Sequence, residues 1–415
     1  MTDLFDVSKI RQKFPALQRQ VAGLPVAFFD GPAGSQVPQQ VADAVSKYLT
    51  STNANHGGLF ATAEESDRVL DAAHQKVADF LGSPDPDCIV FGNNMTSLTF
   101  ALSRALGQTW SSGDEIIVSR LDHDANVTPW VLAARDAGVK VHHIDVHTET
   151  GTLDLNSFQN QLSEKTKLVA VGLASNVTGS INPVAEMIEQ AHAVNAMVFI
   201  DAVHFAPHDL IDVTSLDCDF LACSAYKFFG PHVGMLYGKR THLESLAAYK
   251  LRPSTNELPG KWMTGTQNHE GIAGTAEAVE YLAEIGYQQN PAAENRREAL
   301  KSAFQAITKY EHELTVQLLE GLLEIPNIRI WGITDRDQLS QRVPTISFTH
   351  ENLSTTEIAE TLGQQGLFVW HGNHYGLPFT EAADLEPEGT VRIGILHYNT
   401  AEEITRLLTA IQELG

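Results

Sequence analysis

Cysteine is rare in this chain. Only three of its 415 residues are cysteines, Cys88, Cys218 and Cys223, and their spacing does not match that of a zinc site. Cys218 and Cys223 fall in an apolar stretch, where buried free thiols are common. We therefore expect no metal site, and the scarcity of cysteine fits a reducing compartment.

Positive charge is also in short supply. The chain has 28 lysine and arginine residues against 51 aspartate and glutamate residues, which gives a net charge of -23 with histidine neutral. Such a field repels polyphosphates. Nucleic acid is therefore not an expected partner.

Long apolar runs are missing. No run reaches the roughly 18 residues that suggest a membrane span. The N-terminal segment MTDLFDVSKIRQKFPAL alternates charged with apolar residues and lacks the apolar stretch and the cleavage site of a signal peptide. We expect a soluble, cytoplasmic protein with no membrane partner.

Three widespread motifs are missing as well. The chain has no G-x-G triplet, which removes the dinucleotide-binding G-x-G-x-x-G turn, and it has no G-x-x-x-x-G-K-[ST] loop. It also has no G-x-S-x-G elbow. These absences argue against a nucleotide-binding α/β protein and against a hydrolase of the elbow type.

Short apolar runs alternate with helical patterns over much of the chain, which is typical of βαβ units and a mostly parallel sheet. With 43% hydrophobic residues, a chain of this length can fill two unequal cores. We predict a large α/β domain over residues 17–290, and a smaller α+β domain from residues 1–16 and 291–415 that contains a long helix over 296–325. The seven strands expected in the large domain span residues 88–92, 115–119, 139–146, 167–175, 197–203, 219–225 and 234–238.

Asp201 and Lys227 carry the most information about function. Each is expected at or just beyond the carboxyl end of a strand, the edge of an open α/β sheet where ligands bind. Aromatic neighbours would remove water from the ammonium group of Lys227 and lower its pKa, as Schiff-base formation requires. Asp201 follows the apolar run MVFI and needs a cationic partner, which a protonated pyridine nitrogen supplies. Pyridoxal phosphate explains both residues; the alternative is a capping aspartate and a solvated lysine.

The phosphate of such a cofactor needs an anion site. In FGNNMTSLTFALSRAL a strand ends and a helix begins near Met95, and the N–H groups and dipole of a first helical turn favour an anion. The side chain of Asn94 or Thr96 would assist, and Ser224, three residues before the lysine, could reach the same phosphate. A plain asparagine cap on an amphipathic helix is the alternative.

Three further polar residues that follow strands suit the ring of the cofactor. His123, in SRLDHDANVTPW, is placed to stack on the face of the ring. Asn176, in LASNVTG, has an amide suited to the phenolic oxygen, and His204 could serve the same oxygen. The alternative for His204 is a structural histidine that caps the strand.

At these residues the chain resembles a known family. DAVHFAPH followed by SAYKFFGPHVG is similar to the lysine region of class V aminotransferases, and within them to the cysteine desulfurase and selenocysteine lyase branch. FFDGPAGSQVP, NANHGG, DHDANVTPW and MTGTQN match further segments of the family in order. The resemblance implies the fold of transferases related to aspartate aminotransferase, pyridoxal 5'-phosphate as cofactor, an amino acid as substrate and a homodimer.

The resemblance also implies roles for individual residues. Lys227 would form the Schiff base, Asp201 would pair with the pyridine nitrogen and His123 would stack on the ring. Arg392, in TVRIGILHYNT, would hold the substrate carboxylate with its planar fork. Thr266 would reach the phosphate bound by the neighbouring subunit. The other residues expected in the site are the cofactor contacts Asn94, Met95, Thr96, Asn176, His204, Ser224 and Tyr226, and the substrate contacts His56, His374 and Tyr375.

Tyr375 departs from the family pattern. In VWHGNHYGLPF it stands where desulfurases of this branch carry a nucleophilic cysteine, and no cysteine lies beyond Cys223. A tyrosine cannot accept sulfur as a persulfide, so we expect an aminotransferase or a carbon–sulfur or carbon–selenium lyase. The loop, which also holds His371, Asn373 and His374, should face the substrate or close the pocket.

Other departures and alternatives bear on the reaction. The family's glutamine after the aspartate is His204 here, and its histidine before the lysine is Tyr226, which alters contacts to the cofactor without removing them. Transamination, β-elimination and racemisation begin in the same way, and the fold does not choose among them. Two alternatives stay open: a true cysteine desulfurase with another sulfur acceptor, and a non-catalytic relative that binds the cofactor.

Overall fold

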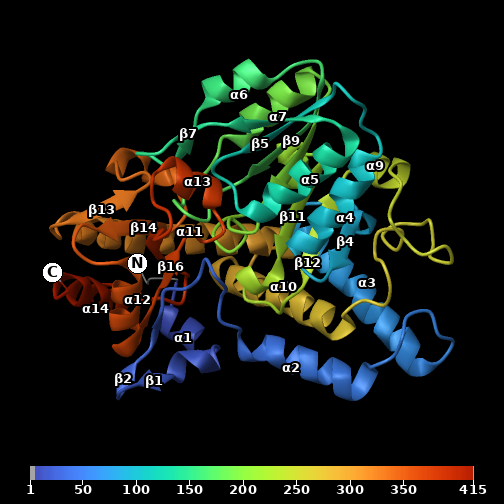
Figure 1. Ribbon diagram of the computed structural model, residues 1–415. Coiled ribbons are helices and arrows are strands. Elements are labelled where there is room, and N and C mark those ends of the chain that lie inside the picture. Colours follow the sequence, from blue (N-terminus) through green and yellow to red (C-terminus); the bar gives the residue numbers. More distant parts are fainter. Residues whose placement is uncertain (1–4, 415) are drawn as a thin grey trace.

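A seven-stranded sheet forms the centre of the larger part of the molecule in the computed structural model, which describes residues 5–414 (Figure 1). Its order is β4-β12-β11-β10-β9-β5-β6, and all neighbouring pairs are parallel except the two made by β12. The mostly parallel seven-stranded sheet predicted from the sequence is confirmed. The strands are Ile89–Gly92 (β4), Glu115–Ser119 (β5), Lys140–Ile144 (β6), Thr166–Gly172 (β9), Met197–Asp201 (β10), Phe220–Ser224 (β11) and Gly234–Gly238 (β12).

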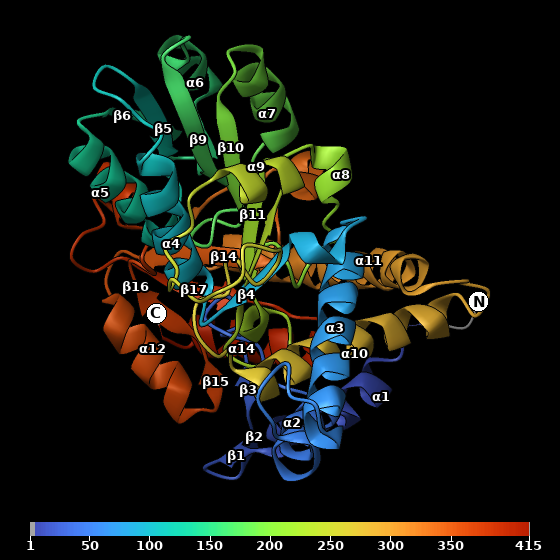
Figure 2. The same ribbon diagram turned by 90° about the vertical axis from the view of Figure 1, so that its right-hand side faces the viewer.

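Helices cover this sheet (Figure 2). β11 and β12 are buried along their whole length, as their apolar sequences FLACS and GMLYG require of strands covered on both faces. α4 packs on β11 and β12, and α7 packs on β9 and β10. The helices of this part are Gln39–Lys47 (α2), Ala61–Leu81 (α3), Met95–Gly107 (α4), Thr128–Ala137 (α5), Leu155–Gln161 (α6), Val184–Ala193 (α7), Val213–Leu216 (α8), Arg240–Ser245 (α9) and His269–Gln289 (α10).

A second, smaller sheet is antiparallel throughout and has the order β13-β14-β17-β16. With its helices it forms the α+β part expected at the C-terminal end of the chain. Ser354 and Thr400 begin two of these helices with complete capping boxes, which satisfy their free backbone N–H groups. The elements are Ile328–Trp331 (β13), Thr345–His350 (β14), Trp370–Gly372 (β16), Thr390–Gly394 (β17), Thr355–Gln364 (α12), Leu377–Ala382 (α13) and Ala401–Gln412 (α14).

One long helix, Arg296–Leu323 (α11), joins the two parts, close to the predicted 296–325. Its first half adds Leu300 and Phe304 to the larger hydrophobic core, and its second half adds Leu314 and Leu318 to the smaller one. Ile10 at the end of helix Val7–Gln12 (α1) belongs to the larger core, although residues 1–16 were assigned to the small domain. Residues 1–4 of that assignment lie outside the described residues, and the domain division itself stays a prediction.

Short paired strands bring distant segments together. Ala27–Phe28 (β3) pairs in parallel with Leu367–Phe368 (β15), so the segment after β3 runs between the two cores toward the end of β11. The expected strand 139–146 is broken, because β6 ends at Ile144 and Val146–His147 (β7) pairs instead with Thr152–Leu153 (β8). Gln20–Val21 (β1) and Leu24–Pro25 (β2) form a separate hairpin. Within residues 5–414, no helix has the length and apolar character needed to cross a membrane.

Candidate active site

A cavity lies at the carboxyl ends of the large sheet. It encloses about 570 Å³ of space, part of it open to solvent. Because β4, β5, β9, β10 and β11 run in the same direction, the residues that follow them meet at one edge. Ten of the residues predicted for the site line this cavity: Asn94, Met95, Thr96, His123, Asn176, Asp201, His204, Ser224, Tyr226 and Lys227.

Lys227 ends a short 3-10 turn, Ala225–Lys227, directly after β11. Burial, with the nearby charge of Arg392, lowers the pKa of its amine from 10.5 to about 7. Nζ donates a hydrogen bond to the backbone oxygen of Pro32 and lies 4.9 Å from the centre of the Tyr226 ring. A substantial fraction of the amine is therefore uncharged at neutral pH and able to act as a nucleophile.

Asp201 is the last residue of β10 and is buried. Burial raises the pKa of its carboxyl from 3.8 to about 6, although the backbone N–H of Val203 donates to Oδ1 at 2.9 Å. None of the ion pairs among residues 5–414 involves Asp201. A buried carboxylate without a cation partner in a cavity wall fits the pyridinium nitrogen of pyridoxal phosphate.

The expected phosphate site lies at the start of α4. Asn94 caps this helix, accepting at Oδ1 from the backbone N–H of Ser97 at 2.8 Å, so the plain capping role is present. The backbone N–H of Met95 donates to Oγ of Ser224 at 3.0 Å, which leaves the Ser224 hydroxyl proton for a ligand oxygen. The backbone of Asn94 lies close to β12, and Gly234 of that strand makes room for it, because a Cβ there would overlap the backbone of Asn94.

Three residues line the part of the cavity expected to hold the ring. His123 accepts at Nδ1 from the backbone N–H of Ala125 at 3.0 Å, and burial lowers the pKa of its imidazole to about 4. His204 and Asn176 are buried, and neither Nε2 of His204 nor Oδ1 of Asn176 has a hydrogen-bond partner in the described chain. Burial holds the pKa of His204 well below its usual range. Unpaired buried polar atoms in a cavity wall fit a ligand that carries polar groups of its own.

Arg392, in β17, is buried and is not among the residues that line the cavity. Nη1 donates to the backbone oxygen of Asn176 at 2.8 Å, and burial lowers the pKa of the guanidinium to about 9. Its Nε has no hydrogen-bond partner among the described residues. The guanidinium therefore keeps a donor that a carboxylate can use.

Asp30 is a site residue that the sequence interpretation did not single out. It follows β3, and its carboxyl lies near the charges of Arg392 and Lys227, while burial raises its pKa from 3.8 to about 6. Its Oδ1 is buried and has no hydrogen-bond partner in the part of the chain that the structure describes. The signal was present, because Asp30 ends the apolar run VAFF just as Asp201 ends MVFI.

Tyr375 lies against His123, with ring centroids 5.3 Å apart and ring planes 16° apart. Its backbone oxygen accepts from the N–H of Asp124 at 2.7 Å, and the backbone oxygen of His374 accepts from Nδ2 of Asn176 at 2.8 Å. The loop after β16 therefore touches two residues expected to hold the cofactor. His371 is exposed, and neither Tyr375 nor His374 is among the residues that line the cavity.

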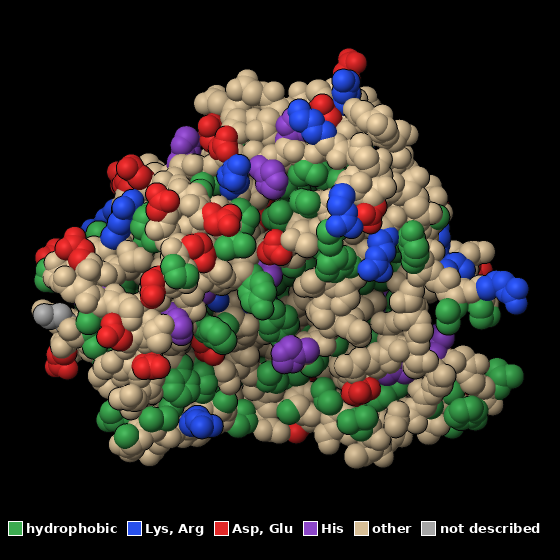
Figure 3. Space-filling model, viewed as in Figure 1, with side chains coloured by type: hydrophobic (Ala, Val, Ile, Leu, Met, Phe, Trp, Pro, Cys, Tyr) green, Lys and Arg blue, Asp and Glu red, His purple; other side chains and the backbone are tan. Residues whose placement is uncertain are grey.

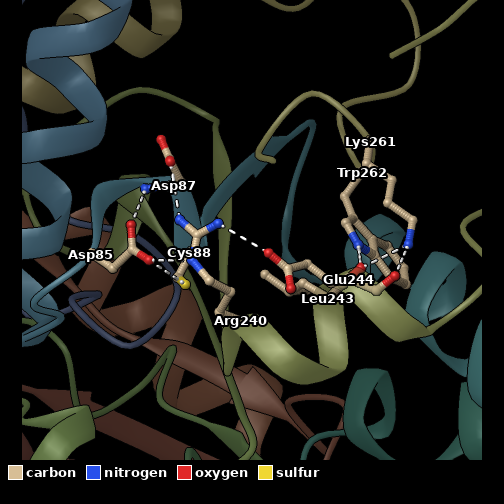
Figure 4. Close-up of polar contacts among 8 residues, drawn as sticks. All are labelled: Asp85, Asp87, Cys88, Arg240, Leu243, Glu244, Lys261 and Trp262. Carbon is tan, nitrogen blue, oxygen red and sulfur yellow. Dashed lines mark hydrogen bonds and ion pairs between the residues drawn. The ribbon is translucent and has the colours of Figure 1, made fainter. Parts of the chain in front are cut away.

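Thr266 and His56 are not brought to the cavity within one chain. Thr266 is exposed in the loop before α10, and His56 is exposed and donates from Nδ1 to Oδ1 of Asp67 at 2.7 Å. The loop of Thr266 is anchored at its base, where Nζ of Lys261 and Nε1 of Trp262 donate to backbone oxygens at the end of α9 (Figure 4). Figure 4 also shows Arg240, at the start of α9, bound to Asp85 and neighbouring carboxylates.

Comparisons with known proteins agree with this arrangement. The chain matches the family Aminotransferase class-V over residues 27–407. It is 32% identical over 424 residues to a cysteine desulfurase of Synechococcus elongatus, covering 99% of this chain and 64% of that protein. A probable cysteine desulfurase of Vibrio cholerae is also 32% identical over 424 residues, with 99% of this chain and 98% of that protein covered.

The fold agrees as well. The apo structure of a cysteine desulfurase from Thermococcus onnurineus NA1 superposes with a TM-score of 0.87 at 27% identity, covering 98% of this chain and 97% of that one. The chain therefore belongs to the class V aminotransferase family, and it is a pyridoxal-phosphate-dependent enzyme of the cysteine desulfurase type.

Proposed function

We propose that this enzyme converts an α-amino acid by transamination or by elimination of a β-thiol or β-selenol group, without passing sulfur to a cysteine of its own chain. This proposal rests on the burial and the pKa values of its three cysteine thiols. Cys88, Cys218 and Cys223 are all buried, and burial raises the pKa of each thiol above its usual range. Because the thiolate is the form that attacks sulfur, none of them is suited to form a persulfide.

Pyridoxal phosphate, when bound, supplies an electrophilic carbon for amines and a ring that withdraws electrons from the carbon beside the bound nitrogen. Lys227 is the amine that would bind it covalently and later move the substrate α-proton, and its lowered pKa supports both roles. Asp201 would hold the ring nitrogen in its protonated form. His123 would cover one face of the ring and exclude water from it.

The remaining cavity residues would fix the cofactor in place. Ser224, Asn94, Met95 and Thr96, at the ends of β11 and β4, would bind the phosphate. Asn176 would meet the phenolic oxygen with its side-chain amide, and His204 would do so through its unpaired Nε2. Tyr226 would complete the cofactor contacts, since it lines the same cavity with its ring centre 4.9 Å from Nζ of Lys227.

Arg392 would hold the α-carboxylate of the substrate through its free Nε. The loop of His374 and Tyr375 contacts Asn176 and His123. His374 would face the substrate side chain, whereas Tyr375, predicted as a substrate contact, would act through His123. His56 would join them from a neighbouring subunit or after a movement of its loop, since it is exposed and remote from the cavity within one chain.

A second copy of the chain is the partner we propose. Leu59 is 97% exposed and Phe60 is 57% exposed, and both follow the segment NANHGG that contains His56. Figure 3 shows hydrophobic side chains gathered at the lower right, over the turn between α2 and α3. Burial of these side chains against a second chain would bring Thr266 to the phosphate site of the partner.

The test is a screen of amino acids with the purified enzyme that measures sulfide, pyruvate, alanine and keto acids. We expect keto acid or pyruvate formation with at least one amino acid. Single Cys88→Ala, Cys218→Ala and Cys223→Ala variants should keep this turnover, with thermal unfolding as the control for folding. Efficient formation of alanine from cysteine, with a persulfide mapped to one of these residues and lost on its substitution, would contradict the proposal.

A further inference from the structure

The loop that carries Tyr375 is held in a strained and closely packed form. His374 and Tyr375 have backbone φ angles of 56° and 59°, in the left-handed region that side chains other than glycine rarely adopt. Gly376 has no room for a side chain, because a Cβ there would overlap Val177. Strain of this kind persists only where surrounding contacts enforce it, and it is concentrated at functional sites.

The contacts that hold this conformation come from both sides of the loop. The N–H of Asp124 and Nδ2 of Asn176 bind the backbone oxygens of Tyr375 and His374, at 2.7 and 2.8 Å. On the other side, Nε2 of His374 lies 3.1 Å from Oγ1 of Thr390 in the small sheet. The loop is thus fixed from both sides, unlike a segment that must move to deliver a bound sulfur atom.

Because the loop is fixed, the ring of Tyr375 has a defined position. The Tyr375 side chain is 71% exposed, yet its ring lies nearly parallel to that of His123 at 5.3 Å. His123 lines the cavity and Tyr375 does not, so the phenol ring supports the imidazole from outside. His123 also accepts at Nδ1 from the backbone N–H of Ala125, which fixes one edge of its ring. The proton of the neutral imidazole is therefore assigned to Nε2.

We propose that Tyr375 is a positioning residue for His123: its ring holds the imidazole from the outer side, so that the inner side stays turned toward the cofactor. In this chain the position that carries a sulfur-accepting cysteine in similar desulfurases supports the stacking histidine instead. The inference rests on the proposed contact between His123 and the cofactor ring. It depends on the flat ring of Tyr375 and not on its hydroxyl group.

The experiment compares Tyr375→Phe with Tyr375→Ala in the cofactor-loaded enzyme. The readouts are the visible circular dichroism of the bound cofactor, which reports how asymmetrically the protein holds it, and the rate of cofactor release after dilution. We expect Tyr375→Phe to match the parent. Tyr375→Ala should lose much of the visible signal and release the cofactor roughly fivefold faster, the scale of one lost aromatic contact.

Two controls make the result decisive. Tyr287→Ala removes a partly exposed phenol ring at the end of α10 and should change neither readout. Thermal unfolding checks that the loop substitutions leave the fold intact. Parent-like behaviour of Tyr375→Ala overturns the proposal, and so does an equal loss in Tyr375→Phe, which would assign the role to the hydroxyl. Neither readout needs a substrate, so a failure to find turnover counts against the proposed reaction alone.

Discussion

Asn176 links Arg392 to the loop of His374. Its backbone oxygen accepts from Nη1 of Arg392, and its side-chain Nδ2 donates to the backbone oxygen of His374, each at 2.8 Å. Asn176 follows β9 of the large sheet, whereas the other two residues belong to the smaller part. Asn176 therefore ties both Arg392 and the loop of His374 to the cofactor cavity.

Replacement of Arg392 should weaken substrate binding. We expect Arg392→Ala to raise KM strongly, by an amount equivalent to about 2 to 5 kcal/mol for a buried charge pair, and Arg392→Lys to restore little because it lacks the planar fork. Steady-state kinetics on the substrate found in the screen measures this. Arg336→Ala is the matched control, because Arg336 is exposed and distant from the cavity. An unchanged KM in Arg392→Ala would remove this residue from the substrate site.

Lys227→Ala should abolish the covalent link to the cofactor. The parent should show a yellow absorption band that borohydride bleaches, and the variant should not, because no other described lysine lines the cavity. Lys309→Ala, on the exposed side of α11, should behave as the parent. A reducible adduct in Lys227→Ala, mapped to another residue, would show that the assignment is wrong.

Attachment of the cofactor should depend on pH through the same amine. Only the uncharged amine reacts, and the pKa of Lys227 lies at about 7. The rate of cofactor incorporation into the apo protein should therefore rise about tenfold per pH unit below 7 and level off above it. Stopped-flow absorbance with excess cofactor measures the profile. A rate that continues to rise to pH 9 would indicate an ordinary lysine.

Asp201→Asn should have opposite effects on the apo and the loaded protein. Burial raises the carboxyl pKa from 3.8 to about 6, so the folded apo protein loses stability as the pH rises through this window. Above pH 6 the amide should therefore stabilise the apo protein, by an amount on the order of 3 kcal/mol. The loaded protein should instead hold its cofactor less tightly, because the pyridinium loses its partner. Urea unfolding at pH 5 and pH 8 and cofactor titration measure the two effects; an apo protein destabilised at pH 8 would contradict this account.

The proposed dimer can be tested at its apolar contact. Phe60→Asp should shift the protein toward monomer in sedimentation at micromolar concentration and weaken cofactor retention, because interfaces of this kind exceed about 2,000 Å² and are apolar at the centre. Thr266→Ala should weaken retention while leaving the dimer intact. Leu323→Asp, at an exposed leucine at the end of α11, is the control. A parent monomer that holds its cofactor would exclude the proposed interface.

The features predicted best from the sequence are those that depend on residues next to one another in the chain, such as strands and the residues at their ends. The strands at 115–119 and 234–238 were predicted to the residue, because each is an apolar run with clear ends. Asp201 and Lys227 were expected at one edge because the carboxyl ends of parallel strands meet there. Strand 139–146 was wrong in its last two residues, because the chain leaves the sheet after Ile144 to form a separate pair of strands.

Contacts between segments far apart in the chain could not be predicted from the sequence. Asp30 reaches the neighbourhood of Lys227 because β3 pairs with β15 and Asp30 itself bridges to Gly394, both more than three hundred residues later in the chain. The stack of Tyr375 on His123 depends on how the smaller sheet is set against the larger one. Neither contact leaves a periodic pattern in the sequence, although each involves a residue of a recognised motif.

Helix α11 restricts how the two parts of the molecule can move. At 1.5 Å per residue its 28 residues extend about 42 Å, with one end in each core. Its only glycine is Gly321, near the last turn, and it contains no proline, so the segment between the cores has none of the usual causes of a kink. A wide hinge opening at this point would require the whole helix to shift against one of the two cores. Substrates should therefore enter and leave through rearrangement of side chains and loops.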